Sequence, residues 1–302
     1  MLLDRLPIIS KLLKFAKSYK IGKLNGMTLY EIVHLYINGL VRGAFSNRAS
    51  AIAFSFFMAL FPFALFILNL IPYIPIKGFQ TDFLLFIEQH VPPTTYEAIE
   101  VILKDILTNS YQGLLSSGFL LSILLMTNGI NAILGGFELS THITITRNFF
   151  RQYLVALWIS LLLSIILIIT VASIVTLEVI IQQIKISPYI SKEISLIQWG
   201  RYLFVILMIL FSTGILYKYG TRETRKISLI SYGAIFTTIL LLISSYLFGI
   251  YVEKFARYNE LYGSIGTLLV LMFYIWINCL VLLLGFELNA TIHKLKGKKT
   301  YI

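Results

Sequence analysis

Long stretches without a charged residue are the feature that most constrains this chain. One of them, 261–286, contains no Asp, Glu, Lys or Arg. A helix needs roughly 20 apolar residues to cross ~30 Å of hydrocarbon. The stretches are continuous rather than alternating, and open sheet edges cannot face lipid, so transmembrane helices are predicted rather than a barrel.

Composition agrees with a membrane solvent. The chain has 302 residues, of which 58% are hydrophobic and 13% are charged, whereas a soluble domain carries about 25% charged residues. The single cysteine, Cys279, lies inside an apolar run. It has no disulfide partner and no metal-ligand spacing, so we interpret it as a small apolar filler.

Six windows meet or approach the length of a membrane span. The fourth is the weakest, because Arg201 lies at its start and Lys218 follows it directly. The predicted fold class is therefore an all-α polytopic membrane protein with spans at about 49–71, 114–134, 152–177, 199–217, 227–252 and 261–286.

Lysine and arginine predict the orientation of these spans. If all six exist, eighteen of the 25 basic residues lie on one side, in 1–48, 218–226, the tail after His293, and at Arg147 and Arg151. This positive-inside bias predicts a multi-pass inner-membrane protein with both termini in the cytoplasm. The net charge of +11 is then explained by topology and by attraction to anionic lipid headgroups. The charges are spread over four segments, so nucleic acid is not the expected partner.

The flanking segments divide the chain into a basic cytoplasmic segment, one membrane domain and a basic cytoplasmic tail, at 1–26, 27–293 and 294–302. Within the membrane domain, residues 27–46 are predicted to form an amphipathic helix. Thr28 and Glu31 have the spacing of a capping box. Polar side chains gather on one face of this helix, so we expect it to lie in the cytoplasmic interface rather than to cross the membrane.

The segment 76–113 is the longest one outside the spans. It holds five acidic residues against Lys77 and Lys104, and Pro92-Pro93 interrupts its helical pattern. A helical hairpin that covers the outer mouth of the bundle is predicted.

The tetrapeptide GFEL occurs twice, at 136–139 and at 285–288. In a chain of this composition we interpret the repetition as chance, because a true repeat would extend much further. Glu138 and His142 are four residues apart and would share a helix face, whereas Glu287 and His293 would not. Both glutamates lie where a span ends.

Three motifs carry a resemblance to a known family. They are RASAIAFSFFMALFPFALFIL at the first span, NGINAILGGFE at the end of the second, and LYGSIGTLLVLMFYIWINCLVLLLGFELNA over the last. In this order they resemble the YihY/BrkB family of polytopic bacterial membrane proteins, over residues 28–293. Phe286 stands where the family usually has alanine. The family has carried a ribonuclease label and a link to serum resistance in a pathogen, and neither provides a mechanism.

Enzyme chemistry has little support in the sequence. The four histidines, His34, His90, His142 and His293, are isolated, and no HxH or HExxH spacing is present. A nuclease needs metal-bound water or an acid–base pair. No nucleotide-binding loop of the form GxxxxGK[ST] occurs. We therefore expect no catalytic site, no metal and no cofactor, and we interpret His34 and His142 as interfacial.

Polar and helix-bending residues within the spans are better candidates. They either bond across helices, each for ~0.6 kcal/mol, or line a path for a substrate. Pro62 is expected to bend the first span. The residues selected on this basis are Arg48, Pro62, Asn128, Asn131, Glu138, Tyr262, Gly263, Ser264, Gly266, Glu287 and Asn289.

Within this set, Arg48 and Glu287 form the most specific hypothesis. Both lie at cytoplasmic ends of spans, where an arginine and a carboxylate can pair through two parallel hydrogen bonds. We expect Glu287 and Asn289 to hold the end of the last span against its neighbours. Glu138 lies in the same layer and could compete for Arg48.

Two functions remain open at this stage. The first is a permease that handles a lipid, an amphiphile or a small solute, without nucleotide hydrolysis. The second is a structural or accessory membrane protein that supports the envelope, and a ribonuclease is a remote third. A cavity lined by Asn128, Asn131 and Glu287 would favour transport, whereas a solid core would favour the accessory role. The oligomeric state is not indicated by the sequence.

Topology can be tested with reporter fusions. Fusions at residues 90, 190 and 256 should report an outside location, and fusions at 145, 222 and 300 an inside location, because basic residues gather on the second set of loops. An outside signal at residue 222 would remove the fourth span.

Overall fold

The structure is a computed structural model. It describes residues 20–21, 27–70, 79–90, 96, 100–101, 103–104, 112–185, 191–255 and 264–298.

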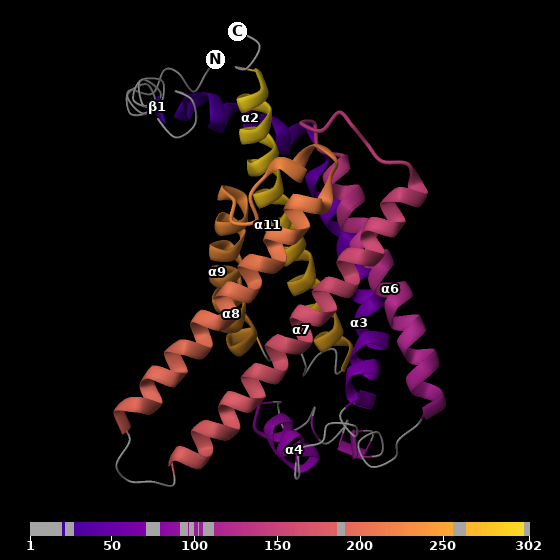
Figure 1. Ribbon diagram of the computed structural model, residues 1–302, viewed down its shortest axis with the longest axis vertical. Coiled ribbons are helices and arrows are strands. Elements are labelled where there is room, and N and C mark those ends of the chain that lie inside the picture. Colours follow the sequence, from indigo (N-terminus) through magenta and orange to yellow (C-terminus); the bar gives the residue numbers. More distant parts are fainter. Residues whose placement is uncertain are drawn as a thin grey trace.

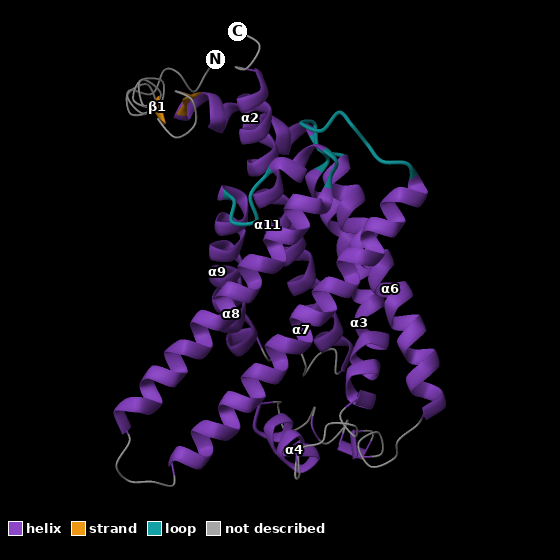
Figure 2. Ribbon diagram, viewed as in Figure 1, coloured by secondary structure: helices purple, strands orange, loops and turns teal. Residues whose placement is uncertain are grey.

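Long helices build almost all of the described structure (Figures 1 and 2). Two strands of two residues, β1 (Lys20–Ile21) and β2 (Met27–Thr28), pair in antiparallel fashion beside them. The predicted all-α polytopic class is confirmed. The main helices are α2 (Leu29–Arg42), α3 (Phe45–Leu70), α4 (Phe79–His90), α6 (Gln112–Glu138), α7 (Phe149–Lys185), α8 (Ser191–Gly220), α9 (Tyr232–Phe255) and α11 (Ser264–Lys298).

Five helices in the described part of the chain are long and apolar enough to cross a membrane, at Leu120–Glu138, Phe149–Ile174, Trp199–Gly220, Tyr232–Val252 and Leu268–Lys296. A multi-pass membrane location follows from these helices. Helix α3 has 26 residues and coincides with the first predicted span, so a sixth span remains a prediction.

Several predicted boundaries differ from the structure. Helix α7 continues past 177 to Lys185, and α8 begins at Ser191 and not at 199. Helix α9 begins at Tyr232 and not near 227, because the Ser231 hydroxyl accepts a hydrogen bond from the Ala234 N–H at 3.2 Å and caps the helix. Helix α11 continues past 286 to Lys298. Residues beyond 286, such as Ala290, remain buried against neighbouring helices. The first residues of the predicted tail therefore belong to the last helix.

Helix α2 starts with the predicted capping box. The Thr28 N–H donates to Glu31 Oε2 at 2.9 Å, and the Glu31 N–H donates to Thr28 Oγ1 at 3.2 Å. Ile32 is buried against Ile292 of α11. In Figure 1, α2 lies across one end of the bundle, which is called the α2 end below. Its position at a membrane surface remains a prediction.

Helix α4 lies at the opposite end of the bundle (Figure 1), called the α4 end. It coincides with the first half of the predicted hairpin. Most of the second half lies outside the described residues. In its described part, Lys104 donates to Glu100 at 2.6 Å over one helical turn.

The tightest packing is found near the α2 end, where α9 and α11 approach each other through two glycines. An added Cβ at Gly285 would lie 2.8 Å from the Gly233 carbonyl oxygen and 2.6 Å from the Tyr217 hydroxyl. Phe137 of α6 stacks on Phe286 with ring centroids 4.0 Å apart. Toward the α4 end, α7 and α8 extend to one side, away from α3 and α6 (Figure 1).

Candidate functional site

A buried carboxylate organises the α2 end. Glu287 of α11 is fully buried, and its Oε1 accepts a hydrogen bond from the Ser140 hydroxyl at 3.0 Å. Its Oε2 lies 3.8 Å from Nη2 of Arg48, at the start of α3. His142 Nε2 lies 3.6 Å from Oε1. Three segments far apart in the sequence therefore meet at one side chain.

The expected contact between Arg48 and Glu287 is thus present, but its geometry differs from the expected pair of parallel hydrogen bonds. The Arg48 guanidinium donates through Nη1 to the Gly43 carbonyl at 3.2 Å. Its Nη2, and Oε2 of Glu287, are buried without a hydrogen-bond partner among the described residues. Ser140 donates to Oε1 of Glu287, and the Gly43 carbonyl accepts from Nη1 of Arg48. The ion pair is therefore made only between Nη2 and Oε2.

Helix α2 covers this cluster through glycines. An added Cβ at Gly39 would lie 2.5 Å from Glu287 Oε1 and 2.7 Å from His142 Nε2. At Gly43 it would lie 2.9 Å from Arg48 Nη1. A larger side chain at either position would displace these buried polar groups or the helix, so glycine allows α2 to lie directly against the carboxylate.

His142 lies in the loop between α6 and α7 and is buried. Burial and, to a smaller extent, the charge of Lys294 lower the pKa of this imidazole. His142 is therefore neutral at pH 7 and does not add a positive charge beside Glu287. Because α6 ends at Glu138, the prediction that Glu138 and His142 share a helix face is wrong.

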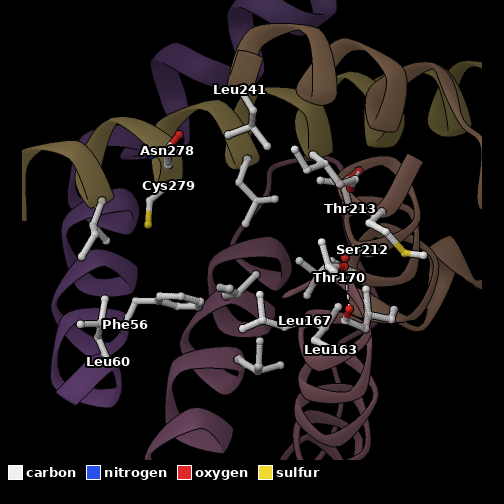
Figure 3. Close-up of a pocket in the computed structure, with 18 of the residues that line it drawn as sticks. Phe56, Leu60, Leu163, Leu167, Thr170, Ser212, Thr213, Leu241, Asn278 and Cys279 are labelled. Atoms are coloured by element: carbon white, nitrogen blue, oxygen red, sulfur yellow. Dashed lines mark hydrogen bonds between the residues drawn. The ribbon is translucent and has the colours of Figure 1, made fainter. Parts of the chain in front are cut away.

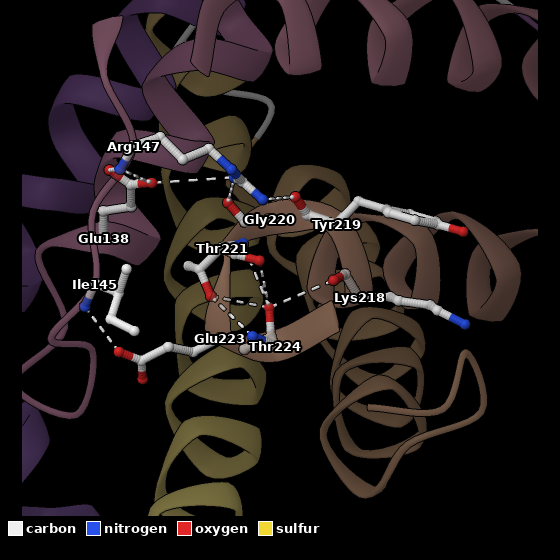
Figure 4. A network of polar contacts seen from close by, with 9 residues as sticks. All are labelled: Glu138, Ile145, Arg147, Lys218, Tyr219, Gly220, Thr221, Glu223 and Thr224. Atoms are coloured by element: carbon white, nitrogen blue, oxygen red, sulfur yellow. Dashed lines mark hydrogen bonds and ion pairs between the residues drawn. The ribbon is translucent and has the colours of Figure 1, made fainter. Parts of the chain in front are cut away.

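A second polar cluster joins the loop before α7 to the end of α8 (Figure 4). The Arg147 guanidinium donates to the carbonyl oxygens of Gly220 at 2.7 Å and Tyr219 at 2.9 Å. It thereby caps the C-terminus of α8, where a cation is favourable. Glu138 accepts from the Arg147 backbone N–H at 3.2 Å and lies 4.0 Å from its Nη1. Glu138 therefore pairs with Arg147 and does not compete for Arg48.

Glu223 lies in the short 3-10 helix η4 (Glu223–Lys226). It binds the loop between α6 and α7 through hydrogen bonds. Its Oε1 accepts from the Thr144 N–H at 2.9 Å and the Thr144 hydroxyl at 2.7 Å. It also accepts from the Ile145 N–H at 2.7 Å (Figure 4). Burial raises the pKa of this carboxyl, but the hydrogen bonds outweigh burial, so the net pKa lies below its ordinary value.

Asn289 forms a third contact at this end. Its Oδ1 accepts from the Gly233 N–H at 2.8 Å, and its Nδ2 donates to the Ser231 hydroxyl at 2.8 Å. Ser231 precedes α9 and caps it, and Gly233 lies in the first turn of α9, whose N–H groups have no partner within the helix. Asn289 therefore ties α11 to the start of α9.

The other sequence-selected residues are not gathered into one site. Asn128 is exposed on the outer surface of α6 and Asn131 is half-buried. Pro62 lies inside α3, where its carbonyl oxygen accepts from the Ser122 hydroxyl at 2.6 Å. Gly266 is buried, and Ser264 is the first residue of α11. Two further candidates lie outside the described residues, Tyr262 and Gly263.

A cavity of about 420 Å³ lies at the centre of the bundle (Figure 3). All six long helices contribute to it. It differs from the expected polar cavity, because neither asparagine of α6 nor Glu287 lines it. Its walls are Phe56, Leu60, Ile130, Ile133, Leu163, Ile166, Leu167, Thr170, Val205, Met208, Ile209, Ser212, Thr213, Leu216, Leu241, Tyr274, Ile275, Asn278, Cys279 and Leu282.

Three of the polar side chains on these walls donate to helix backbone. The hydroxyls of Thr170 and Thr213 donate to the carbonyls of Ile166 and Ile209 at 2.7 and 3.0 Å. Asn278 donates to the Tyr274 carbonyl at 2.9 Å. The cavity therefore offers an apolar surface, which suits a hydrocarbon group far better than an ion.

The fold and these sites define a polytopic helical membrane protein with an apolar cavity between its long helices and a cluster of buried polar contacts at the α2 end. The chain belongs to the family described as virulence factor BrkB, whose model matches residues 37–301. It is 31% identical over 257 residues to the ribonuclease-like protein YfkH of Bacillus subtilis (strain 168), covering 83% of this chain and 90% of the relative.

It is also 23% identical over 246 residues to a protein described as UPF0761 membrane protein from Coxiella burnetii (strain Dugway 5J108-111), covering 79% of this chain and 84% of that protein. Further strains of the same organism carry a protein with the same similarity. No solved structure matches the chain.

Several residues of the buried cluster were missed from the sequence. Ser140, His142 and Gly39 carry no local pattern that separates them from other polar or small residues near helix ends. Arg147 was counted only as a basic loop residue. In each case the role depends on a partner that is more than 70 residues away in the chain or on another helix.

Coupling between Arg48 and Glu287 can be measured with a double-mutant cycle. Glu287→Ala and Arg48→Ala should each lower the free energy of unfolding by about 3–5 kcal/mol, because either change leaves a buried charge without its partner. The double variant should lose less than the sum of the two. Stability would be followed by thermal unfolding in detergent.

The matched control is Glu100→Ala, which breaks an ion pair whose side chains are 57% and 35% exposed and should change stability little. Strict additivity of the two buried substitutions, or a loss for Glu287→Ala as small as the control, would contradict the coupling.

Glu223 should make stability depend on pH. Because the folded-state pKa is below the ordinary value, its contribution is present above the pKa of the unfolded chain, about 4.3. It is lost as the pH falls through the lower folded-state pKa. The unfolding temperature of Glu223→Gln should therefore lie below that of the parent at pH 7, and the gap should close in acid. A gap that is constant with pH, or unchanged in a Thr144→Val background, would contradict this assignment.

Proposed function

We propose that this protein is a permease that moves a lipid or a lipid-like amphiphile through the inner membrane, with the α2 end in the cytoplasm. The observation that carries the proposal is the apolar cavity at the centre of the six long helices. Its volume of about 420 Å³ lies in the range of ligand pockets, ~300–1,000 Å³. A membrane protein that served only as a scaffold has no need for a space of this size between its helices.

The two ends of the cavity differ in a way that supports directional access. Toward the α2 end it is closed by the stacked rings of Phe137 and Phe286 and by the buried Arg48–Glu287 layer. Toward the α4 end, α7 and α8 lie apart from α3 and α6 (Figure 1). An amphiphile with an acyl chain would enter laterally from the lipid, between the helices that line the cavity. Movement to the other side would require the α2 end to open.

The cytoplasmic location of the α2 end rests on charge. The α6–α7 link with Arg147, the α8–α9 link with Arg222 and Arg225, and the end of α11 with Lys294 all lie at this end (Figure 1). Short basic loops stay on the cytoplasmic side during insertion. With the termini in the cytoplasm, the α4 end faces the outside.

A ribonuclease function is not part of the proposal. The term ribonuclease-like belongs to the description of the relative YfkH. In the part of the chain that the structure describes, no group of three or more His, Cys, Asp or Glu residues could hold a metal ion. The buried pair of His142 and Glu287 lies beneath Gly39 of α2, out of reach of a polymer. We propose that the protein is not an enzyme and that it has no nucleic-acid partner.

The proposal is tested by filling the cavity in vesicles that contain the purified protein. Transbilayer movement of a phospholipid with a fluorescent headgroup label is followed by chemical quenching of the outer leaflet. Thr170→Trp places an indole into the cavity and should reduce the rate at least several-fold. Thr176→Trp is the matched control, since Thr176 lies on the same helix and makes the same backbone hydrogen bond, but is exposed.

Movement no faster than in protein-free vesicles would contradict the proposal and favour the accessory role. Equal rates for the two tryptophan variants would mean that lipid moves along the protein surface and not through the cavity.

A further inference from the structure

A second hollow lies on the outside of the bundle, between α7 and α8 at the α2 end. It has a volume of about 840 Å³ and shares no lining residue with the central cavity. One half is basic and the other half is apolar. It is lined by Arg147, Arg151, Leu154, Val155, Trp158, Ile159, Leu162, Ile215, Tyr219, Arg222 and Arg225.

The basic half combines one fixed arginine with three exposed ones. Arg147 is buried, and its donors are taken up by the end of α8. Arg151 comes from the first turn of α7, and Arg222 and Arg225 come from the link after α8. All three are exposed. No hydrogen bond or ion pair joins their guanidinium groups to other residues that the structure describes.

The acidic residues near these arginines are already engaged. Glu138 contacts Arg147, and Glu223 accepts three hydrogen bonds from Thr144 and Ile145. Burial lowers the pKa of Arg147, and the positive charges of the three exposed arginines lower it further. Repulsion among like charges therefore persists in this half of the groove, and a bound anion would relieve it.

The apolar half follows a single stripe of α7. Leu154, Trp158 and Leu162 are spaced by four residues, so they lie one above the other on the helix. They are 60%, 71% and 37% exposed. At 1.5 Å per residue, the distance along α7 from Arg151 to Leu162 is about 16 Å. This is roughly half of the ~30 Å hydrocarbon thickness, which corresponds to one leaflet.

We propose that this groove binds one anionic phospholipid from the leaflet at the α2 end, with its phosphate at Arg151, Arg222 and Arg225 and its acyl chains along Leu154, Trp158 and Leu162. The arginines at one end match a phosphodiester, since guanidinium groups bind phosphate oxygens in a forked geometry. The exposed apolar stripe matches the acyl chains. A free phosphate or a nucleic acid would neutralise the arginines but would provide no apolar group to pack against the other half of the groove.

The site is independent of the proposed transport function. It lies on the outer surface of the α7–α8 pair, and a lipid bound there would join the two helices where they cross the headgroup layer. Loss of lipid movement through the cavity and loss of this binding site can therefore be observed separately.

Tryptophan fluorescence provides a direct test. The chain has three tryptophans, and a variant with Trp199→Phe and Trp276→Phe retains only Trp158 in the groove. In mixed micelles, phosphatidylglycerol with brominated acyl chains should quench Trp158 at about a hundred-fold lower concentration than brominated phosphatidylcholine, because each of the three exposed arginines adds about 1 kcal/mol for an anionic lipid. Inorganic phosphate at millimolar concentration should not displace the brominated lipid.

Two controls separate a built site from general attraction. In the same background, the triple change Arg151→Gln, Arg222→Gln and Arg225→Gln should abolish the preference while quenching by phosphatidylcholine stays the same. Neutralising Lys226, Lys294 and Lys296 to Gln removes equal charge at the same end and should leave the preference intact. A variant that retains only Trp199, which is 72% exposed near the other end of α8, should show no preference.

Equal quenching of Trp158 by both lipids would overturn the proposal, and so would a preference that survives the triple arginine change. A preference of the same size at Trp199, or displacement by phosphate alone, would also overturn it. The unfolding temperature of each variant shows whether a lost preference comes from a lost fold. If the arginine variant is unfolded, the single change Trp158→Ala, followed by lipid-dependent thermal stabilisation, decides the question: loss of the phosphatidylglycerol effect supports the proposal, and its retention refutes it.

Discussion

The burial of the Glu287 carboxylate is the interaction on which the α2 end of the protein depends. One side chain on α11 meets Ser140 from the loop after α6 and Arg48 from the start of α3. Helix α2 closes over it with a glycine. Because a buried charge without its partner is costly, each of these segments stabilises the position of the others. Asn289, two residues further along α11, ties the start of α9 to the same layer.

This closed end contrasts with the interior below it. The central cavity has an apolar wall in which Thr170 and Asn278 donate to carbonyls of their own helices, and α7 and α8 extend away from the bundle beyond it (Figure 1). A bundle of this form is rigid where charges and aromatic rings are packed, and it has fewer internal contacts where helices face lipid. Any conformational change that opens the α2 end must break the contacts of Glu287 together, since they share one carboxylate.

Arginines have two separate roles at this end. Arg48 and Arg147 are buried and bond to carbonyl groups of helix ends or loops, so they contribute to the fold. Arg151, Arg222 and Arg225 are exposed beside an apolar groove, so their charge is directed toward the surroundings. The positive-inside signal in the sequence therefore contains both structural cations and cations that can contact lipid headgroups. Sequence position alone does not separate the two groups.

The sequence by itself determined the class of fold, because charge-free runs and the Thr28–Glu31 capping box are local signals whose outcome depends on hydrocarbon thickness and backbone hydrogen bonds. It also brought Arg48 and Glu287 to the same end. It could not orient Asn128 and Asn131, since α6 is apolar on all sides and has no face that periodicity can identify. The central cavity carried no signal because leucine and isoleucine are equally common on lipid-facing walls. Only the tertiary structure placed Ser140 and Gly39 beside Glu287, because these contacts depend on how separate helices pack and not on any one segment.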